Sequence, residues 1–192
     1  MKKYFLLFCL AGAALLSGAE DIFNGGFEIC VPDHSGTPMP RNWISNSAVT
    51  RNGKARLTRE TGCFRNGSFG LLTETEEKGC LSFRAMKTIP VKTGEFIEME
   101  IWAKGTGMFK LQYILYGTDD PKRSVFLSTV GTVKTHKVAE DDWKCYKVKV
   151  KFVPPKKAEG KFTSFALLPV IYVCSDSEIL FDDFALKISA EK

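Results

Sequence analysis

Residues 146–152 read Tyr-Lys-Val-Lys-Val-Lys-Phe, an unbroken alternation of apolar and charged side chains. Successive side chains of a β-strand point to opposite faces, so this period of two predicts a strand with one buried face and one wet face. Tyr146, Val148, Val150 and Phe152 form the predicted buried face. The three lysines between them are therefore interpreted as a solvated face and not as an anion site.

The same alternation recurs along the chain. Residues 97–102 and 109–115 predict two strands of this kind, and residues 162–174 and 178–188 predict two more, the first nearly all apolar and so expected to be central. Turn signals punctuate these runs, among them Asn24-Gly25-Gly26, Asn52-Gly53, Asn66-Gly67 and Gly105-Thr106-Gly107. Closely spaced strands without a convincing helical stretch predict an all-β sandwich or barrel.

Composition is that of an ordinary globular chain. Of its 192 residues, 44% are hydrophobic and 26% are charged, which fits one domain able to bury a core. Disordered, collagen-like and coiled-coil chains are excluded. The formal net charge of +5 is modest and scattered, so no nucleic-acid partner is expected.

The first nineteen residues have the layout of a secretory signal peptide. Lys2 and Lys3 precede an apolar run at residues 4–16, and small residues at 17–19 predict cleavage after Ala19. Thirteen apolar residues span only about 20 Å of a hydrocarbon layer of about 30 Å, so a membrane anchor is not favoured. We expect residues 20–192 to form a single domain that is secreted, periplasmic or on the cell surface, without a membrane span.

The mature chain would keep five cysteines: Cys30, Cys63, Cys80, Cys145 and Cys174. An odd number cannot all pair within the chain. Two pairings are open, Cys63 with Cys80 and Cys30 with Cys174, and the alternative is five reduced thiols. With no CxxC pair and only two histidines, a zinc site is not expected.

Several short motifs, in order, resemble the jelly-roll carbohydrate-binding modules attached to xylanases and other glycoside hydrolases, of the galactose-binding-like superfamily. The resemblance covers nearly the whole mature chain and implies a two-sheet antiparallel β-sandwich. The chain departs from the family pattern at Gly70, which replaces the usual small or hydroxyl residue before a strand. It also departs in its five cysteines and in a basic insertion at residues 119–138. The matching segments are 24–28 (Asn-Gly-Gly-Phe-Glu), 40–43, 66–71, 89–94, 101–104, 142–146 and 180–186.

The resemblance implies a structural Ca²⁺ that ties the first strand to the last. Its ligands would be the carbonyl of Gly26 and the carboxylates of Glu28 and Asp182. Ca²⁺ takes oxygen ligands of these kinds. Asp182 and Asp183 should point to opposite faces of a strand, so only one can face inward. The alternative is that Glu28 and Asp182 accept backbone hydrogen bonds and hold no ion.

A glycan groove needs exposed aromatic rings beside polar side chains. If Ile97, Met99 and Ile101 face the core, Trp102 shares the outer face with Glu98 and Glu100. Gln112 and Tyr116 are expected to extend this surface on the following strand. The alternative is that Trp102 packs inside. Tyr113 and Tyr172 are expected to be core residues. We expect the residues 122–137 to form a hairpin at one edge of the groove.

Catalysis has little support in the sequence. Glu98 and Glu100 lie about 6.8 Å apart along a strand, a spacing that glycoside hydrolysis permits but that any Glu-x-Glu shares. Nucleophile-elbow, phosphate-loop, zinc-protease and dinucleotide motifs are absent from the sequence. We therefore expect a secreted, non-catalytic protein that binds a polysaccharide or surface glycan. The alternatives are an envelope or extracellular module that binds a protein partner after losing the sugar site, and an enzyme that depends on Glu98 or Glu100.

Overall fold

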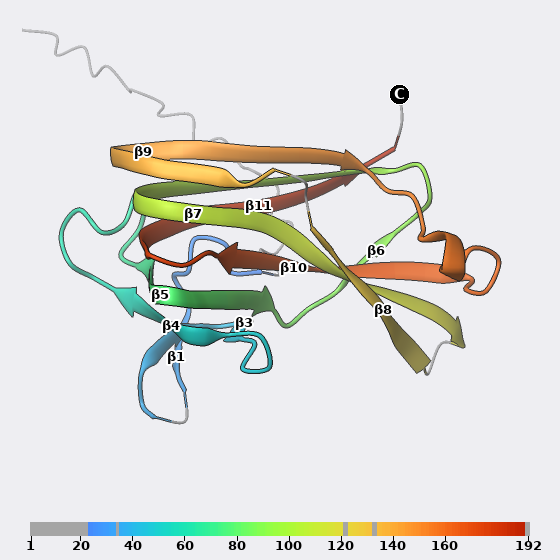
Figure 1. Ribbon diagram of the computed structural model, residues 1–192, viewed down its shortest axis with the longest axis horizontal. Helices are drawn as coiled ribbons and strands as arrows, with labels where there is room; N and C mark the ends of the chain where they lie inside the picture. The colour runs from blue at the N-terminus through green and yellow to red at the C-terminus, as the bar shows by residue number, and fades with distance from the viewer. Residues whose placement is uncertain (1–22, 34, 121–122, 132–133, 191–192) are drawn as a thin grey trace, which may run out of the picture.

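The computed structural model describes residues 23–33, 35–120, 123–131 and 134–190, so the predicted signal peptide lies outside the described residues. Almost all regular structure in the described part is strand (Figure 1). The elements are β1 (Cys30–Pro32), β2 (Pro38–Pro40), β3 (Trp43–Ser45), β4 (Arg51–Thr58), β5 (Gly70–Ala85), β6 (Ile89–Val91), β7 (Phe96–Asp120), β8 (Arg123–Gly131), β9 (His136–Lys151), the 3-10 helix η1 (Lys156–Ala158), β10 (Ser164–Val173) and β11 (Ser177–Ser189).

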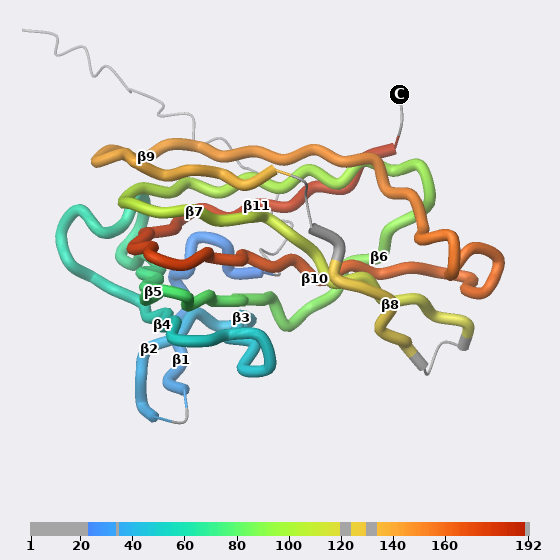
Figure 2. Tube along the Cα trace, viewed as in Figure 1, coloured from blue at the N-terminus to red at the C-terminus, as the bar shows by residue number. Residues whose placement is uncertain are grey.

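The strands form an antiparallel two-layer sandwich, as predicted. Sheet 1 has the order β4, residues 70–75 of β5, β11, residues 96–106 of β7, and β9. Sheet 2 has the order β3, residues 81–85 of β5, β10, residues 109–118 of β7, and β8, with β6 beside β10. Figure 1 shows β9, β7 and β11 running together across the top of the molecule, and Figure 2 traces the path of β7 from this layer down toward β8.

The two predicted strands at residues 97–102 and 109–115 are one strand, β7, which passes from sheet 1 to sheet 2. The change of sheet falls between residues 106 and 109, next to two glycines with positive φ, +113° at Gly105 and +139° at Gly107. A Cβ at Gly105 would lie 2.3 Å from the carbonyl oxygen of Glu178. The glycine-rich signal at residues 105–107 therefore marks a bend, and the turn interpretation was wrong. Asn52-Gly53 likewise lies inside β4, at an irregularity in its pairing with β5.

The core fills the space between the layers, and its face pattern follows the predicted parity. Ile97, Met99 and Ile101 are almost completely buried. Trp43 is also buried, stacks on Phe83 with ring centroids 5.5 Å apart, and donates its indole N–H to the carbonyl of Phe23 at 2.6 Å. These contacts fix the N-terminal segment against sheet 2.

The prediction that residues 122–137 form a hairpin of their own was wrong, because in the described part they contribute one strand, β8, and His136 already begins β9 of sheet 1. β8 pairs antiparallel with the second half of β7 and forms an edge of sheet 2. Among the described residues, no helix is long and apolar enough to cross a membrane.

Candidate functional site

The predicted calcium residues lie where the N-terminal turn, residues 65–69 and β11 meet. A bulge in β11 between Asp182 and Ala185 buries Asp182 completely and leaves Asp183 partly exposed. The expectation that only one of the two faces inward is confirmed. Phe184, next in the bulge, donates its backbone N–H to the carbonyl of Gly25 at 2.9 Å. The bulge thus joins β11 to the N-terminal turn.

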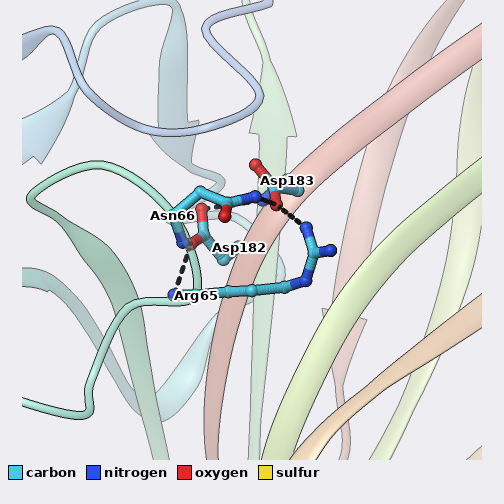
Figure 3. A network of polar contacts seen from close by, with 4 residues as sticks. All are labelled: Arg65, Asn66, Asp182 and Asp183. Atoms are coloured by element: carbon cyan, nitrogen blue, oxygen red, sulfur yellow. Dashed lines mark hydrogen bonds and ion pairs between the residues drawn. The ribbon is translucent and has the colours of Figure 1, made fainter.

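Asp182 and Asp183 hold the loop at residues 65–66 (Figure 3). The Asp182 carboxylate accepts backbone N–H bonds from Arg65 at 2.7 Å, Asn66 at 3.1 Å and Asp183 at 2.8 Å. The Asp183 carboxylate pairs with the guanidinium of Arg65 and accepts a bond from the Asn66 amide at 2.6 Å. Burial raises the pKa of Asp182 to about 6, although the three backbone N–H groups oppose this.

Glu28 clamps the other end of the same loop. Its carboxylate accepts the backbone N–H of Ser68 at 2.9 Å and that of Phe69 at 3.1 Å. Gly67 permits this approach, because its φ is +70° and a Cβ there would lie 2.2 Å from Oε1 of Glu28. Glu28 and Asp182 therefore both act as acceptors of backbone hydrogen bonds.

This arrangement leaves the calcium expectation a prediction. Within the described ranges, no three His, Cys, Asp or Glu side chains are grouped closely enough to hold a metal ion. Backbone N–H groups face the carboxylate oxygens of Glu28 and Asp182, and the Arg65 guanidinium lies beside Asp183. A calcium ion at Gly26, Glu28 and Asp182 would have to use the remaining lone pairs of these carboxylates.

Trp102, Glu98 and Glu100 share the outer face of sheet 1, as predicted. Each carboxylate is already paired with a lysine of β9: Glu98 with Lys149 at 2.6 Å, and Glu100 with Lys147 at 2.7 Å. The hydrogen bond from Lys149 lowers the pKa of Glu98. A depression of about 460 Å³ lies over these ion pairs, but none of its lining residues is aromatic.

The Trp102 ring is partly exposed and has a partner of its own. The guanidinium carbon of Arg65 lies 3.8 Å from the ring centroid, a cation–π contact. Arg65 also pairs with Asp183, so the loop at residues 65–66 covers a face of the ring. A sugar would have to displace Arg65 to stack on that face.

Gln112 and Tyr116 lie on the other side of the molecule. Both belong to the part of β7 that has crossed into sheet 2, and they occupy its outer face together with Ile114. The expected single surface is therefore two surfaces, because β7 bends where the sequence suggested a turn between neighbouring strands. The structure does not bring Gln112 or Tyr116 together with Trp102, Glu98 and Glu100.

The outer face of sheet 2 carries a hollow that sequence reasoning missed. Its volume is about 240 Å³, and we call it the sheet 2 groove. Val170 and Ile114 form an almost buried apolar floor. Polar groups and one aromatic ring line the sides, and the lining residues are Asn46, Val49, Ser82, Gln112, Ile114, Thr129, Val170 and Tyr172.

Aromatic side chains mark both ends of this face. Tyr172 is opposite Lys110, and Tyr116 is six residues farther along β7, so about 20 Å separates the two tyrosines along the strand. Phe126 of β8 is 58% exposed and meets the Tyr116 ring edge to face, with centroids 6.3 Å apart. An aromatic ring at each end and amides between them suit a linear ligand with alternating apolar and hydroxyl surfaces.

No protein-family model matches the sequence, and neither does any curated protein. Solved structures do share the fold. This chain superposes over 86% of its length on an enzymatically active domain of tailspike protein 4 from bacteriophage CBA120, with 16% identity and a TM-score of 0.55.

Two further structures contain modules on xylanases. The chain superposes over 79% of its length on the CBM22-1–GH10 modules of Clostridium thermocellum xylanase 10B complexed with xylohexaose, with 17% identity and a TM-score of 0.52. It superposes over 87% of its length on the tandem CBM22-1–CBM22-2 domain of Paenibacillus barcinonensis Xyn10C, with 14% identity and a TM-score of 0.50. The chain spans 21%, 27% and 45% of these three chains. The resemblance to jelly-roll carbohydrate-binding modules is confirmed at the level of the fold.

Proposed function

We propose that this chain is an exported, non-catalytic carbohydrate-binding protein whose ligand lies in the sheet 2 groove. The observation that carries the proposal is the combination of Tyr172, Gln112 and Asn46 around an apolar floor, with Tyr116 farther along the same face. Sugar rings present C–H faces that pack on aromatic rings, and their hydroxyls require amide or hydroxyl partners. The groove offers both.

Charge distribution favours sheet 2 over sheet 1 for this role. On sheet 1, Glu98 and Glu100 are paired with lysines, and Arg65 lies over Trp102. A ligand there would have to break ion pairs and a cation–π contact before making its own contacts. On sheet 2 the Phe126 ring is already open to solvent, and the Tyr116 and Tyr172 rings are partly so.

Xylan is the first polysaccharide to test, because one fold neighbour is complexed with xylohexaose. Affinity gel electrophoresis of the purified protein would compare soluble xylan with a panel of other soluble polysaccharides, with calcium present. We expect retardation by at least one polymer. Tyr116→Ala and Tyr172→Ala should each weaken binding about tenfold, as expected for aromatic residues that dominate a contact.

Trp102→Ala is the matched control, since it removes a partly exposed aromatic ring from the opposite face. It should leave retardation unchanged. Loss of binding in this variant, with both tyrosine variants unaffected, would move the site to sheet 1. If no polymer retards the protein, carbohydrate binding is contradicted, and a module that binds an extracellular protein partner becomes the better interpretation.

A further inference from the structure

Cys80 and Cys174 are brought together at one end of the sheet 2 groove. Strand β10 pairs with β5 through Val173 and Leu81, so the next residues along the two strands are Cys174 and Cys80. The backbone N–H of Cys174 donates to the carbonyl of Met108 in β7 at 2.8 Å. The backbone N–H of Cys174 therefore points toward β7 and not toward β5, which makes Cys80 and Cys174 a non-hydrogen-bonded cross-strand pair. The carbonyl of Cys174 accepts the side-chain hydroxyl of Thr75 at 2.5 Å.

Such a pair has suitable geometry for a disulfide. Directly opposite residues of this type have Cα atoms about 4.5 Å apart, and disulfides join Cα atoms about 4.4–6.8 Å apart. Both side chains have the strand parity of Ser82 and Tyr172, so both lie on the outer face of sheet 2. Both cysteines are partly exposed and hence open to a reagent.

The surrounding groups show that the two thiols and a tyrosine form one cluster. A hydrogen bond with Cys80, together with burial, raises the pKa of Tyr172 to about 12. Burial raises the pKa of Cys174, the charge of Lys110 opposes this, and Cys80 adds to it. Cys80 also donates its thiol to the carbonyl of Val49 at 3.2 Å, next to the groove.

The two pairings considered from the sequence do not have this geometry. Thr58 of β4 pairs with Gly70, and Arg51 pairs with Cys80, so seven residues of β4, about 23 Å, separate Gly70 from Cys80. The carbonyl of Cys63 packs directly against Gly70, which places Cys63 at the far end of β5 from Cys80. Cys30 pairs with Pro40 in the β1–β2 hairpin, whereas Cys174 has Cys80 opposite it.

We propose that Cys80 and Cys174 are a thiol–disulfide site that joins β5 to β10 beside the groove. The oxidant is a disulfide, either of a small thiol compound or of an oxidoreductase. One cysteine thiolate attacks that disulfide and releases one thiol; the second cysteine then attacks the mixed disulfide and releases the other. One S–S bond forms in the protein, one is lost from the oxidant, and two thiols leave. The inference does not depend on carbohydrate binding.

The test is peptide mapping of the purified protein after incubation with oxidised glutathione, with remaining thiols alkylated under denaturing conditions. We expect one dominant cross-linked peptide pair containing Cys80 and Cys174. Dithiothreitol should restore both alkylated peptides. Closure should also lower the pKa of Tyr172, read as the alkaline phenolate absorbance of wild-type protein against Tyr172→Phe, because the thiol partner is consumed.

Single variants sharpen the result. Cys80→Ser and Cys174→Ser should lose the cross-link, and in each the remaining cysteine should be recovered with glutathione attached. Cys30→Ser is the matched control and should form the cross-link as the wild type does. A dominant link between Cys63 and Cys80, or between Cys30 and Cys174, would overturn the proposal. Recovery of Cys80 and Cys174 as separately alkylated peptides after oxidation would overturn it as well.

Discussion

Replacing Asp182 with asparagine tests how the carboxylate that holds the loop at residues 65–66 responds to pH. The side chain is fully buried, and burial raises its pKa to about 6 from an ordinary value of 3.8. Between these two pH values the folded protein binds a proton that the unfolded chain does not. The resulting stability is fully present below pH 3.8 and is lost as the pH rises through about 6.

The size of the effect follows from the two pKa values. At pH 7 the side chain is ionised in both states and contributes almost nothing to the pH dependence. At pH 5 it is mostly protonated in the folded state and mostly ionised in the unfolded chain. Proton linkage then adds about 1.4 kcal/mol to the free energy of unfolding at pH 5 relative to pH 7.

Urea denaturation followed by tryptophan fluorescence, with EDTA present, measures this contribution. Asp182→Asn does not titrate, and its amide cannot accept every backbone N–H that the carboxylate accepts. It should therefore be less stable than the wild type by about 1–3 kcal/mol at pH 5, where the wild-type side chain is protonated, and this deficit should shrink at pH 7. The decisive quantity is the change from pH 7 to pH 5, which should differ between wild type and variant by about 1.4 kcal/mol. Other titrating groups cancel in that comparison.

An equal change in the free energy of unfolding from pH 7 to pH 5 in wild type and variant would refute the reasoning. It would mean that the three backbone N–H groups keep the carboxylate ionised and outweigh its burial. Calcium provides a second arm. If the ion binds Asp182, millimolar calcium should stabilise the wild type more at pH 7 than at pH 5, since the proton and the ion compete for the same oxygens. Absence of stabilisation at pH 7 would contradict the calcium prediction.

Three further perturbations test the fold around the site. Trp43→Ala removes a buried, stacked ring and should lower the free energy of unfolding by about 3–5 kcal/mol in urea denaturation. Trp143→Ala, at a partly exposed position, should lower it far less. Equal losses in the two variants would contradict the packing described. Gly67→Ala should destabilise more than Gly94→Ala in thermal melts, because both glycines have positive φ but only the first has a side chain in the way. His136 is buried, and burial lowers its pKa, so the unfolded chain binds a proton more readily and stability should fall as the pH drops below about 6.5. His136→Phe should remove this loss of stability. The same pH profile of stability in wild type and variant would refute this role of His136.

Strand parity is the part of the structure that the sequence predicts best. The alternation at residues 146–152 and 97–101 places the correct side chains in the core, because a period of two fixes the face of every residue once one face is known. What parity cannot predict is which sheet a strand belongs to. A glycine that permits a bend inside β7 has the same sequence signal as a glycine in a turn, and Gly105 is such a case.

The N-terminal motif illustrates a second limit. Residues 24–28 resemble a family signature, and the structure gives each polar group a local role. The Asn24 side chain accepts the backbone N–H of Ile29 and donates to its carbonyl, and Glu28 accepts two backbone N–H groups. The role of Glu28 depends on a loop about 40 residues away. Spacing within the motif therefore could not distinguish an ion ligand from a hydrogen-bond acceptor.

The prediction that Tyr172 is a core residue was wrong for a physical reason. It lies in an apolar run, residues 165–173, where the alternation that identifies an outer face is lost because Leu168 and Val170 are buried on that face too. When a strand is buried on both faces, its sequence does not indicate which of its residues reach solvent. In this sandwich the opening is produced by polar groups from other segments, Gln112 of β7 and Asn46 directly after β3, that flank the apolar floor. The groove is thus a property of strand order, and strand order follows from the bend in β7 that separates Gln112 from Trp102.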